Sequence, residues 1–469
     1  MKPLASVVLA IVVLAAAPSA QPSLPSELGT QIDVAVHDVL TKTSLPSASV
    51  GIVRDGRIVF TKAYGMARIA PPMPASADMH YAVGSISKQF TAACILLLQQ
   101  DGKLTIDDPV GKYLPELTRA NDVKLRHILS HTSGYQDYAP QDYTIPSWTK
   151  PTTADAIVHE WATKPLDFEP GSQYQYSNTN FNIAGLIVEK ASGEKFWTFL
   201  SRRVLTPLHL TRTIDLDTQH DQLEPTGYMR NALGPLRPAI MEAPGWYFAD
   251  GELAMPVGDL LTWDVSLIDE SLLHHDSYAA METDQPLTGG GTAHYGLGVA
   301  VSVRDGRRVI SHGGEVGGFV AQNIVYPDQK IAVAVLTNQE ASSGASAIAR
   351  SIVALLLPPA TKATSGNDTA AAEAQAKRIL IGLQQGKIER SLFTDNCNFY
   401  FDETAINDYA SSLKPLGTLS MVKQSDTFLR GGMRFRSFDV TFTRGPKLRL
   451  TTFTTSDGKL EQFLIGPAG

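Results

Sequence analysis

A serine and a lysine three residues apart, Ser85 and Lys88, stand at the start of an apolar stretch of the chain. After Gly84, apolar residues recur with the spacing of one helical face, at Ile86, Phe90, Ala93, Cys94, Leu97 and Leu98. On such a helix Lys88 lies beside Ser85. Burial disfavours a charged ammonium, and the N–H groups of a first helical turn favour negative charge. The pair therefore predicts nucleophilic catalysis through a covalent intermediate.

The Ser-x-x-Lys spacing alone carries little weight. It recurs at Ser147/Lys150, Ser192/Lys195, Ser411/Lys414, Ser420/Lys423 and Ser456/Lys459. A capping serine beside a solvated lysine is its ordinary interpretation. Ser85 differs because its helix is too apolar for a surface helix, and because of two motifs further along the chain.

The two motifs are Tyr176-Ser177-Asn178, just before a predicted helix from Asn180 to Ala191, and His312-Gly313-Gly314-Glu315, among late strands. Taken singly, the first is a turn and helix cap and the second a turn between strands.

Together, Ser85-x-x-Lys88, Tyr176-x-Asn178 and His312-Gly313-Gly314 resemble, in order and separation, the signature elements of the serine β-lactamase and penicillin-binding superfamily, class C type. That group also holds D-aminopeptidases, D-alanyl-D-alanine carboxypeptidases and esterases. Three more stretches look like the family: residues 125–134, Pro170-Gly171 and Tyr295-Gly296-Leu297-Gly298.

The resemblance implies a role for each residue. Ser85 is the acylated nucleophile and Lys88 takes or relays its proton. Tyr176 is the second acid/base, provided that neighbouring cations lower its pKa. Asn178 hydrogen-bonds Lys88 and the substrate. The backbone N–H groups of Ser85 and Glu315 form the oxyanion hole.

Gly313 and Gly314 let a strand edge approach the substrate closely. Most relatives of the β-lactamase type have Lys followed by Thr or Ser where this chain has His312 and Gly313. The change removes the ammonium and hydroxyl that hold a β-lactam carboxylate, so we expect poor β-lactam hydrolysis. His312 is expected to hydrogen-bond Tyr176 or the substrate, and activity to change as it titrates.

Strand-like runs at both ends of residues 24–357 enclose a helical middle. This order predicts an α/β (α+β) two-lobed β-lactamase-like domain, an antiparallel sheet flanked by helices plus a helical lobe. Residues 358–369 have linker composition. Residues 370–469 read as a second, small α+β domain whose order of elements resembles the nuclear-transport-factor type.

Residues 1–20 resemble a secretory signal peptide: a lysine at position 2, an apolar run, and small residues at its end where cleavage would occur. The alternative is an uncleaved membrane anchor. We expect a periplasmic or extracellular protein without a stable membrane span after cleavage. Cys94 and Cys397 are too few and too distant for a disulfide framework, and two free, buried thiols are favoured over a pair.

A net charge of −7 without any basic run argues against nucleic-acid binding. No spacing of His, Asp or Glu predicts a metal site, and no cofactor is implied; His127, His131 and the His274-His275 pair are interpreted as structural.

The leading hypothesis is a secreted serine hydrolase that cleaves an ester or amide, with a D-amino-acid peptide or small acyl compound as substrate. The alternatives are a penicillin-binding D-Ala-D-Ala carboxypeptidase or weak β-lactamase, and a catalytically silent protein that binds peptidoglycan fragments.

Overall fold

In the computed structural model, the described residues are 24–357, 370–430, 433–455 and 458–468. The predicted signal peptide at 1–20 and the predicted linker at 358–369 lie outside them.

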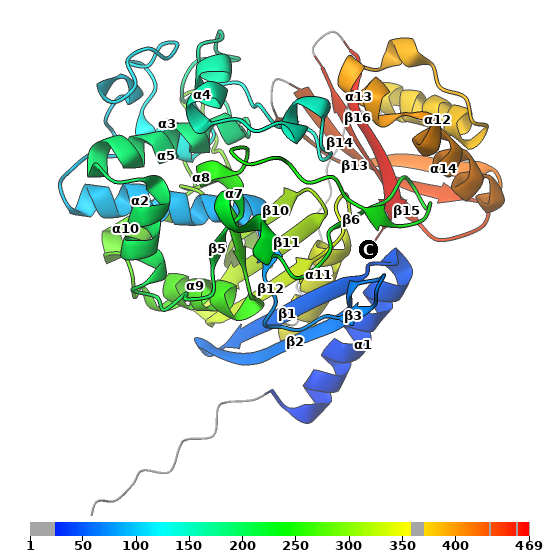
Figure 1. Cartoon of the computed structure of the whole chain (residues 1–469), viewed down its shortest axis with the longest axis horizontal. Helices are drawn as coiled ribbons and strands as arrows, with labels where there is room; N and C mark the ends of the chain where they lie inside the picture. Colours follow the sequence, from blue (N-terminus) through cyan, green and yellow to red (C-terminus); the bar gives the residue numbers. More distant parts are fainter. Residues whose placement is uncertain (1–23, 358–369, 431–432, 456–457, 469) are drawn as a thin grey trace, which may run out of the picture.

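A seven-stranded antiparallel sheet forms the centre of the larger part of the chain (Figure 1). Its order is β3 (Met73–Pro74), β2 (Arg57–Arg68), β1 (Ser47–Arg54), β12 (Ile331–Thr337), β11 (Phe319–Tyr326), β10 (Arg307–Val316) and β9 (Ala300–Arg304). The N-terminal hairpin thus pairs with strands from nearly 300 residues later. The central strands β1 and β12 are buried almost throughout, because helices cover both faces of the sheet.

Helices cover both faces of this sheet. On one face α1 (Ser26–Thr43) and α11 (Gly344–Leu356) share an apolar core with β1 and β12. On the other face α9 (Val257–Asp269) packs against β1 and β12 and joins the sheet to the helical lobe.

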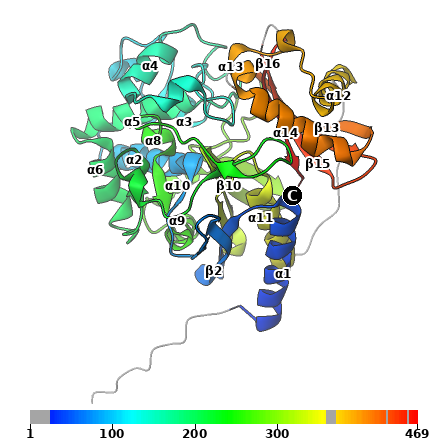
Figure 2. The same ribbon diagram turned by 45° about the vertical axis from the view of Figure 1, so that its right-hand side comes forward.

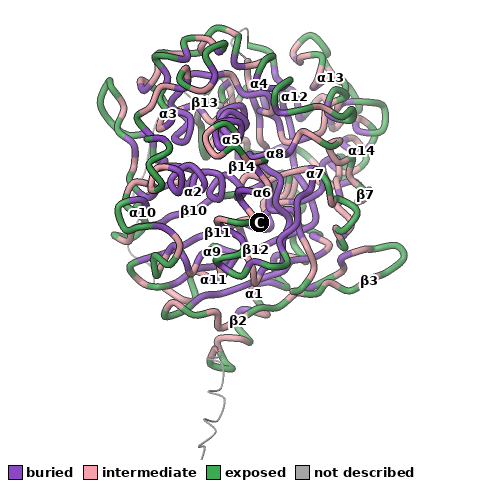
Figure 3. Tube along the Cα trace, turned by 60° about the vertical axis from the view of Figure 1, so that its left-hand side comes forward, coloured by how far each residue is buried: buried purple, intermediate pink, exposed green. Residues whose placement is uncertain are grey.

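The helical lobe is built around α2 (Ser87–Gln100) and α5 (Asn178–Ser192), which are buried along most of their length (Figure 3). The other helices of this region are α3 (Leu125–Leu129), α4 (Ala154–Ala162), α6 (Phe196–Leu200), α7 (Leu216–Gln219), α8 (Phe248–Gly251) and α10 (His275–Met281). Two further small sheets occur in residues 24–357. One is formed by β4 (Tyr81–Ala82), β8 (Leu253–Met255) and β5 (Ile214–Asp215), and the other by β6 (Tyr228–Met229) and β7 (Arg237–Pro238). An antiparallel sheet flanked by helices with a helical lobe confirms the predicted fold class.

The C-terminal residues form a separate four-stranded antiparallel sheet with its own apolar core. Its helices are α12 (Ala370–Gln384), α13 (Asp395–Tyr400) and α14 (Glu403–Leu413). Its strands run in chain order, β13 (Leu419–Arg430), β14 (Met433–Phe442), β15 (Leu448–Thr454) and β16 (Leu460–Pro467). This C-terminal domain lies beside the helical lobe, with β16 and α13 facing the loops that precede α4 (Figure 2).

Cys94 and Cys397 are both free and buried, as predicted. Burial raises the pKa of both thiols above the ordinary value, so they are poor nucleophiles. No described helix has the length and apolarity needed to cross a membrane.

Candidate active site

Ser85 lies in a 3-10 turn, Gly84–Ile86, that leads directly into α2. Gly84 has φ +51°, and a β-carbon there would lie 2.7 Å from the backbone nitrogen of Glu315 on β10. Only glycine permits both this backbone conformation and so close an approach. The turn therefore presents Ser85 at the junction between the helical lobe and the sheet.

Lys88 is fully buried. Its Nζ lies 2.9 Å from Ser85 Oγ, 2.7 Å from Asn178 Oδ1 and 2.8 Å from the backbone oxygen of Asp250. Three acceptors match the three N–H bonds of an ammonium group. In the neutral amine form one of these contacts reverses, and Ser85 can donate its proton to Nζ.

Asn178 is held in one orientation by Asp137. Its backbone N–H donates to Asp137 Oδ1 at 2.9 Å, and its Nδ2 donates to the same oxygen at 3.1 Å and to the Ala139 carbonyl at 3.1 Å. Because the amide nitrogen is used in this way, the amide oxygen must face Lys88. The start of α5 is thus capped by a carboxylate 41 residues earlier, rather than by a local side chain.

Asp250, on α8, is a second buried acid beside Lys88. Its Oδ2 lies 4.0 Å from Lys88 Nζ and accepts a 2.9 Å hydrogen bond from the Tyr138 hydroxyl. Burial raises the pKa of Asp250 to about 7, although the nearby Lys88 opposes the rise. The charge next to Lys88 therefore varies within the neutral pH range.

Tyr176 lies in the extended segment just before α5, and its ring lies near Lys88, His131 and His312. Lys88 Nζ is 5.2 Å from its ring centroid, and the rings of His131 and His312 are 4.1 and 6.1 Å away. His131 is buried, and its Nδ1 also accepts the Ser177 backbone N–H at 3.2 Å. The histidine that the sequence marked as structural thus supports the Tyr176 segment.

His312 is buried within β10, so the His-Gly-Gly motif is part of a strand and not a turn. Its Nε2 lies 2.7 Å from the hydroxyl of Tyr295, and its backbone N–H donates to Asn323 Oδ1 at 3.1 Å. Burial raises the pKa of Tyr295 well above its usual value. The phenol therefore stays protonated and can donate a hydrogen bond to His312 Nε2.

The backbone of β10 runs against the turn that holds Ser85. A β-carbon on Gly314 would lie 1.8 Å from the Val83 carbonyl oxygen and 3.0 Å from the Ser85 nitrogen. The Glu315 backbone therefore lies next to the Ser85 turn, where the predicted oxyanion hole requires it. The Glu315 side chain accepts a 2.5 Å hydrogen bond from the Ala341 backbone N–H.

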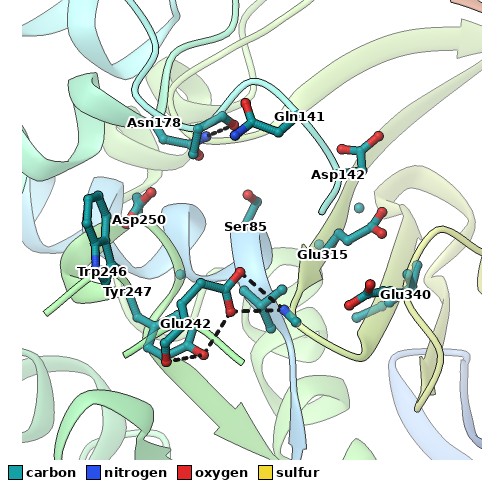
Figure 4. A pocket seen from close by; sticks show the side chains of 18 of the residues that line it. Ser85, Gln141, Asp142, Asn178, Glu242, Trp246, Tyr247, Asp250, Glu315 and Glu340 are labelled. Carbon is teal, nitrogen blue, oxygen red and sulfur yellow. Dashed lines mark hydrogen bonds between the residues drawn. The ribbon is translucent and has the colours of Figure 1, made fainter. Parts of the chain in front are cut away.

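A cleft of about 430 Å³, shown in Figure 4, is lined by Ser85, Tyr176, Asn178, Asp250, His312, Gly314 and Glu315 among others. Tyr138, Trp148, Trp246 and Tyr247 contribute aromatic surface to it. Its acidic lining residues are Asp142, Glu242, Asp250, Glu315 and Glu340, and among the described residues that line it there is no Lys or Arg. Burial raises the pKa of Glu242 and brings that of Glu340 to about 8. The cleft thus favours a neutral or positively charged ligand.

The structure brings Ser85, Lys88, Tyr176, Asn178, His312, Gly314 and Glu315 together around this cleft. The sequence analysis did not single out three polar residues that contact the predicted site: Asp137 beside Asn178, Asp250 beside Lys88, and Tyr295 beside His312. Tyr295 stands in a family-like stretch of the sequence and could have been singled out there. Within the described residues, no cluster of three or more His, Cys, Asp or Glu side chains is arranged to hold a metal ion.

A family model described as Beta-lactamase matches residues 32–357, and the chain belongs to this family. The "D-aminopeptidase" of Brucella canis is 26% identical over 343 residues, which cover 70% of this chain and 63% of the relative. The chain thus matches somewhat less than two thirds of that protein's length.

Two solved structures extend the comparison. A D-stereospecific amidohydrolase from Streptomyces has a TM-score of 0.60 and 28% identity, covering 71% of this chain and 99% of its own. The octameric penicillin-binding protein homologue from Pyrococcus abyssi has a TM-score of 0.62 and 22% identity, and covers 93% of this chain and 99% of its own. The second likeness shows that its fold also resembles this chain beyond residue 357.

Proposed function

We propose that this protein is a serine hydrolase that cleaves the amide bond of a D-amino-acid amide or peptide with a free amino group, through an acyl-enzyme on Ser85. The observation that carries the proposal is the buried contact of Lys88 Nζ with Ser85 Oγ, at 2.9 Å, fixed by Asn178 and by the Asp250 carbonyl. The names of the relatives, D-aminopeptidase and D-stereospecific amidohydrolase, support the substrate class.

In the proposed reaction, Ser85 Oγ attacks the substrate carbonyl and its proton passes to Lys88 Nζ. The backbone N–H groups of Ser85 and Glu315 stabilise the oxyanion. When the tetrahedral intermediate collapses, the C–N bond breaks and the leaving amine takes a proton from the Tyr176–Lys88 pair. Water then attacks the ester carbonyl, Ser85 recovers its proton, and the acid product leaves.

The charge of the cleft separates this proposal from the carboxypeptidase alternative. A carboxypeptidase must bind a terminal carboxylate, whereas five acidic side chains and no Lys or Arg line the described part of this cleft. Those of the five acids that are ionised attract an α-ammonium group, and the buried ones can accept a hydrogen bond from it. The lining also supports the expectation of poor β-lactam hydrolysis, because a β-lactam carries a carboxylate.

The test is a panel of substrates that differ in one feature at a time: D-alanine p-nitroanilide, its L-enantiomer, its N-acetylated form, a D-Ala-D-Ala peptide, p-nitrophenyl acetate and nitrocefin. We expect the free D-anilide to be hydrolysed fastest and N-acetylation to lower kcat/KM. Ser85→Ala should abolish turnover. Ser87→Ala is the matched control, because the Ser87 hydroxyl accepts the Leu253 backbone N–H at 3.1 Å and takes no part in the reaction.

Equal turnover of the acetylated anilide would contradict the role of the ammonium group. Preference for the D-Ala-D-Ala peptide or nitrocefin would favour the alternatives. Turnover that survives Ser85→Ala would overturn the nucleophile assignment.

A further inference from the structure

An irregular segment of the larger domain, residues 137–144, which belongs to no helix or strand, connects the C-terminal domain to the cleft. The Asp142 backbone N–H donates to Gln462 Oε1 at 2.7 Å, and Gln462 Nε2 donates back to Asp142 Oδ2 at 3.0 Å. The Tyr143 hydroxyl donates to the Glu461 backbone oxygen at 2.6 Å. Gln462 is fully buried in β16, so its amide has a fixed position.

The other end of the same segment holds the partners of Lys88. Asp137 orients Asn178, and Tyr138 donates to Asp250. Asn178 and the Asp250 backbone are two of the three groups that contact Lys88 Nζ. A continuous set of hydrogen bonds and a short stretch of chain therefore runs from β16 to the amine beside Ser85.

An irregular segment such as 137–144 depends on contacts with other parts of the protein to keep its conformation. Its backbone lacks the repeated hydrogen bonds of a helix or a sheet, so its conformation depends on the side chains that bind it. Two of its residues, Asp142 and Tyr143, line the cleft and are bound to β16 at the same time. Figure 4 shows Asp142 beside Glu315 and Glu340, on the side of Ser85 away from Asp250 and Trp246.

We propose that the C-terminal domain is part of the catalytic apparatus and that Gln462 is a positioning residue: by binding Asp142 from β16 it fixes the cleft wall at 137–144 and, through it, the geometry around Lys88. This inference rests on the proposed function for its reaction, and it adds a role for the domain that lies outside the family match at 32–357.

Other contacts hold the two domains together outside residues 137–144. Arg237 forms an ion pair with Asp408, the Leu233 backbone N–H donates to the Ser412 hydroxyl at 3.3 Å, and the Ser343 hydroxyl donates to the Pro467 carbonyl at 3.1 Å. Asp408→Ala therefore weakens the docking of the domains without touching residues 137–144. It is the matched control for Gln462→Ala.

The experiment uses the full chain and three readouts: kcat/KM with the best substrate of the panel, the rate at which a fluorophosphonate labels Ser85, and amide hydrogen exchange of residues 137–144. A displacement of about 1 Å at a site can cost about a hundredfold in rate. We expect Gln462→Ala to lower kcat/KM and the labelling rate by about tenfold to a hundredfold, and to speed exchange in the segment. Asp408→Ala should stay within about twofold of the wild type on all three, even if both variants lower the melting temperature.

Gln462→Glu adds a readout that a purely structural role would not move. The new carboxylate has Asp142 and Glu461 as acidic neighbours and cannot donate to Asp142 Oδ2 unless it carries a proton. We expect its activity, relative to the wild type, to be highest at acidic pH and to fall as the pH rises.

The inference is overturned if Gln462→Ala costs no more activity than Asp408→Ala, or if exchange in 137–144 is unchanged. These outcomes are distinct from a failure of the proposed function. If Ser85 is labelled but no D-substrate is turned over, the substrate assignment fails, while the labelling rates and the exchange still decide the role of Gln462.

Discussion

Gly314 lies so close to Val83 that a β-carbon on the glycine would be 1.8 Å from the valine carbonyl oxygen. The contact joins β10, which carries His312, to the residue between β4 and the Ser85 turn. The neighbouring Gly313 is different, since its β-carbon would meet nothing nearer than the Gln322 amide oxygen at 3.7 Å. Two adjacent glycines therefore differ sharply in the space around them.

Gly314→Ala should disable the protein, because the added methyl group cannot fit without moving β10 away from Ser85. We expect fluorophosphonate labelling to fall by at least about a hundredfold and the melting temperature to drop. Gly313→Ala is the control for the loss of a glycine from the same strand, and we expect it to keep the wild-type melting temperature. Normal labelling of Gly314→Ala would show that this close approach is not needed for the site.

Asn178→Ala should lower kcat/KM by roughly a hundredfold, because Lys88 loses one acceptor and Asp137 loses a donor from the side chain. Asn182 lies one turn further along α5 and is also buried, but its amide oxygen and nitrogen have no hydrogen-bond partner among the described residues. Asn182→Leu should therefore keep activity and leave stability unchanged or higher. Kinetics and urea unfolding of the two variants check this, and equal losses of activity would indicate a general effect of altering α5.

Tyr295→Phe should impair the protein through His312. The substitution removes the hydroxyl 2.7 Å from His312 Nε2 and leaves a buried ring nitrogen without that partner, which costs about 1–3 kcal/mol of stability. We expect a lower melting temperature and a lower kcat/KM, measured side by side with Tyr326→Phe. Tyr326 is a buried tyrosine on β11 whose hydroxyl forms no side-chain hydrogen bond within the described part of the chain. Similar losses in both variants would argue against a special role of the Tyr295–His312 contact.

Most of the fold follows from local patterns in the sequence. The polar pattern at residues 403–413 predicts a helix, and α14 has these bounds. The Asp55-Gly56 pair predicts a tight turn between two strands, and it joins β1 to β2. The residue pattern also predicts a strand from Tyr295 to Val303. This prediction is wrong in its first half, because regular β9 begins at Ala300. A β-carbon on Gly296 would lie 2.0 Å from the Met281 carbonyl oxygen, and Gly298 has φ +76°, so the chain turns there before the strand starts.

The site could be predicted only where its residues stand in short motifs. Ser85, Lys88, Tyr176, Asn178 and His312 do so, and the structure gathers them. Asp137 and Asp250 have no such pattern, because they act on residues 41 and 162 positions away in the chain, and only the folded arrangement of α5 and α8 brings them there. For the same reason α5 begins at Asn178 rather than at Asn180, since its cap is a distant carboxylate.

Asp264 provides a test of stability against pH that is independent of catalysis. This residue of α9 is fully buried, accepts a 2.8 Å hydrogen bond from Asn323 Nδ2, and its other oxygen has no hydrogen-bond partner among the described residues. Burial raises the pKa of its carboxyl group to about 8. Because the pKa is higher in the folded chain than in the unfolded one, this group's contribution to stability is complete below about pH 4 and is lost as the pH rises through about 8.

Asp264→Asn is uncharged at every pH and should remove this loss. We expect urea unfolding curves of the wild type and the variant to lie closest at pH 5 and to separate in favour of the variant towards pH 9, by up to about 1.4 kcal/mol per pH unit. Asp269→Asn, an exposed acid near the end of the same helix, controls for the loss of one negative charge. If the difference between the wild type and Asp264→Asn stays constant over this range, Asp264 does not hold its proton in the folded protein, and the buried network of Asp264 and Asn323 behind His312 contains a charge.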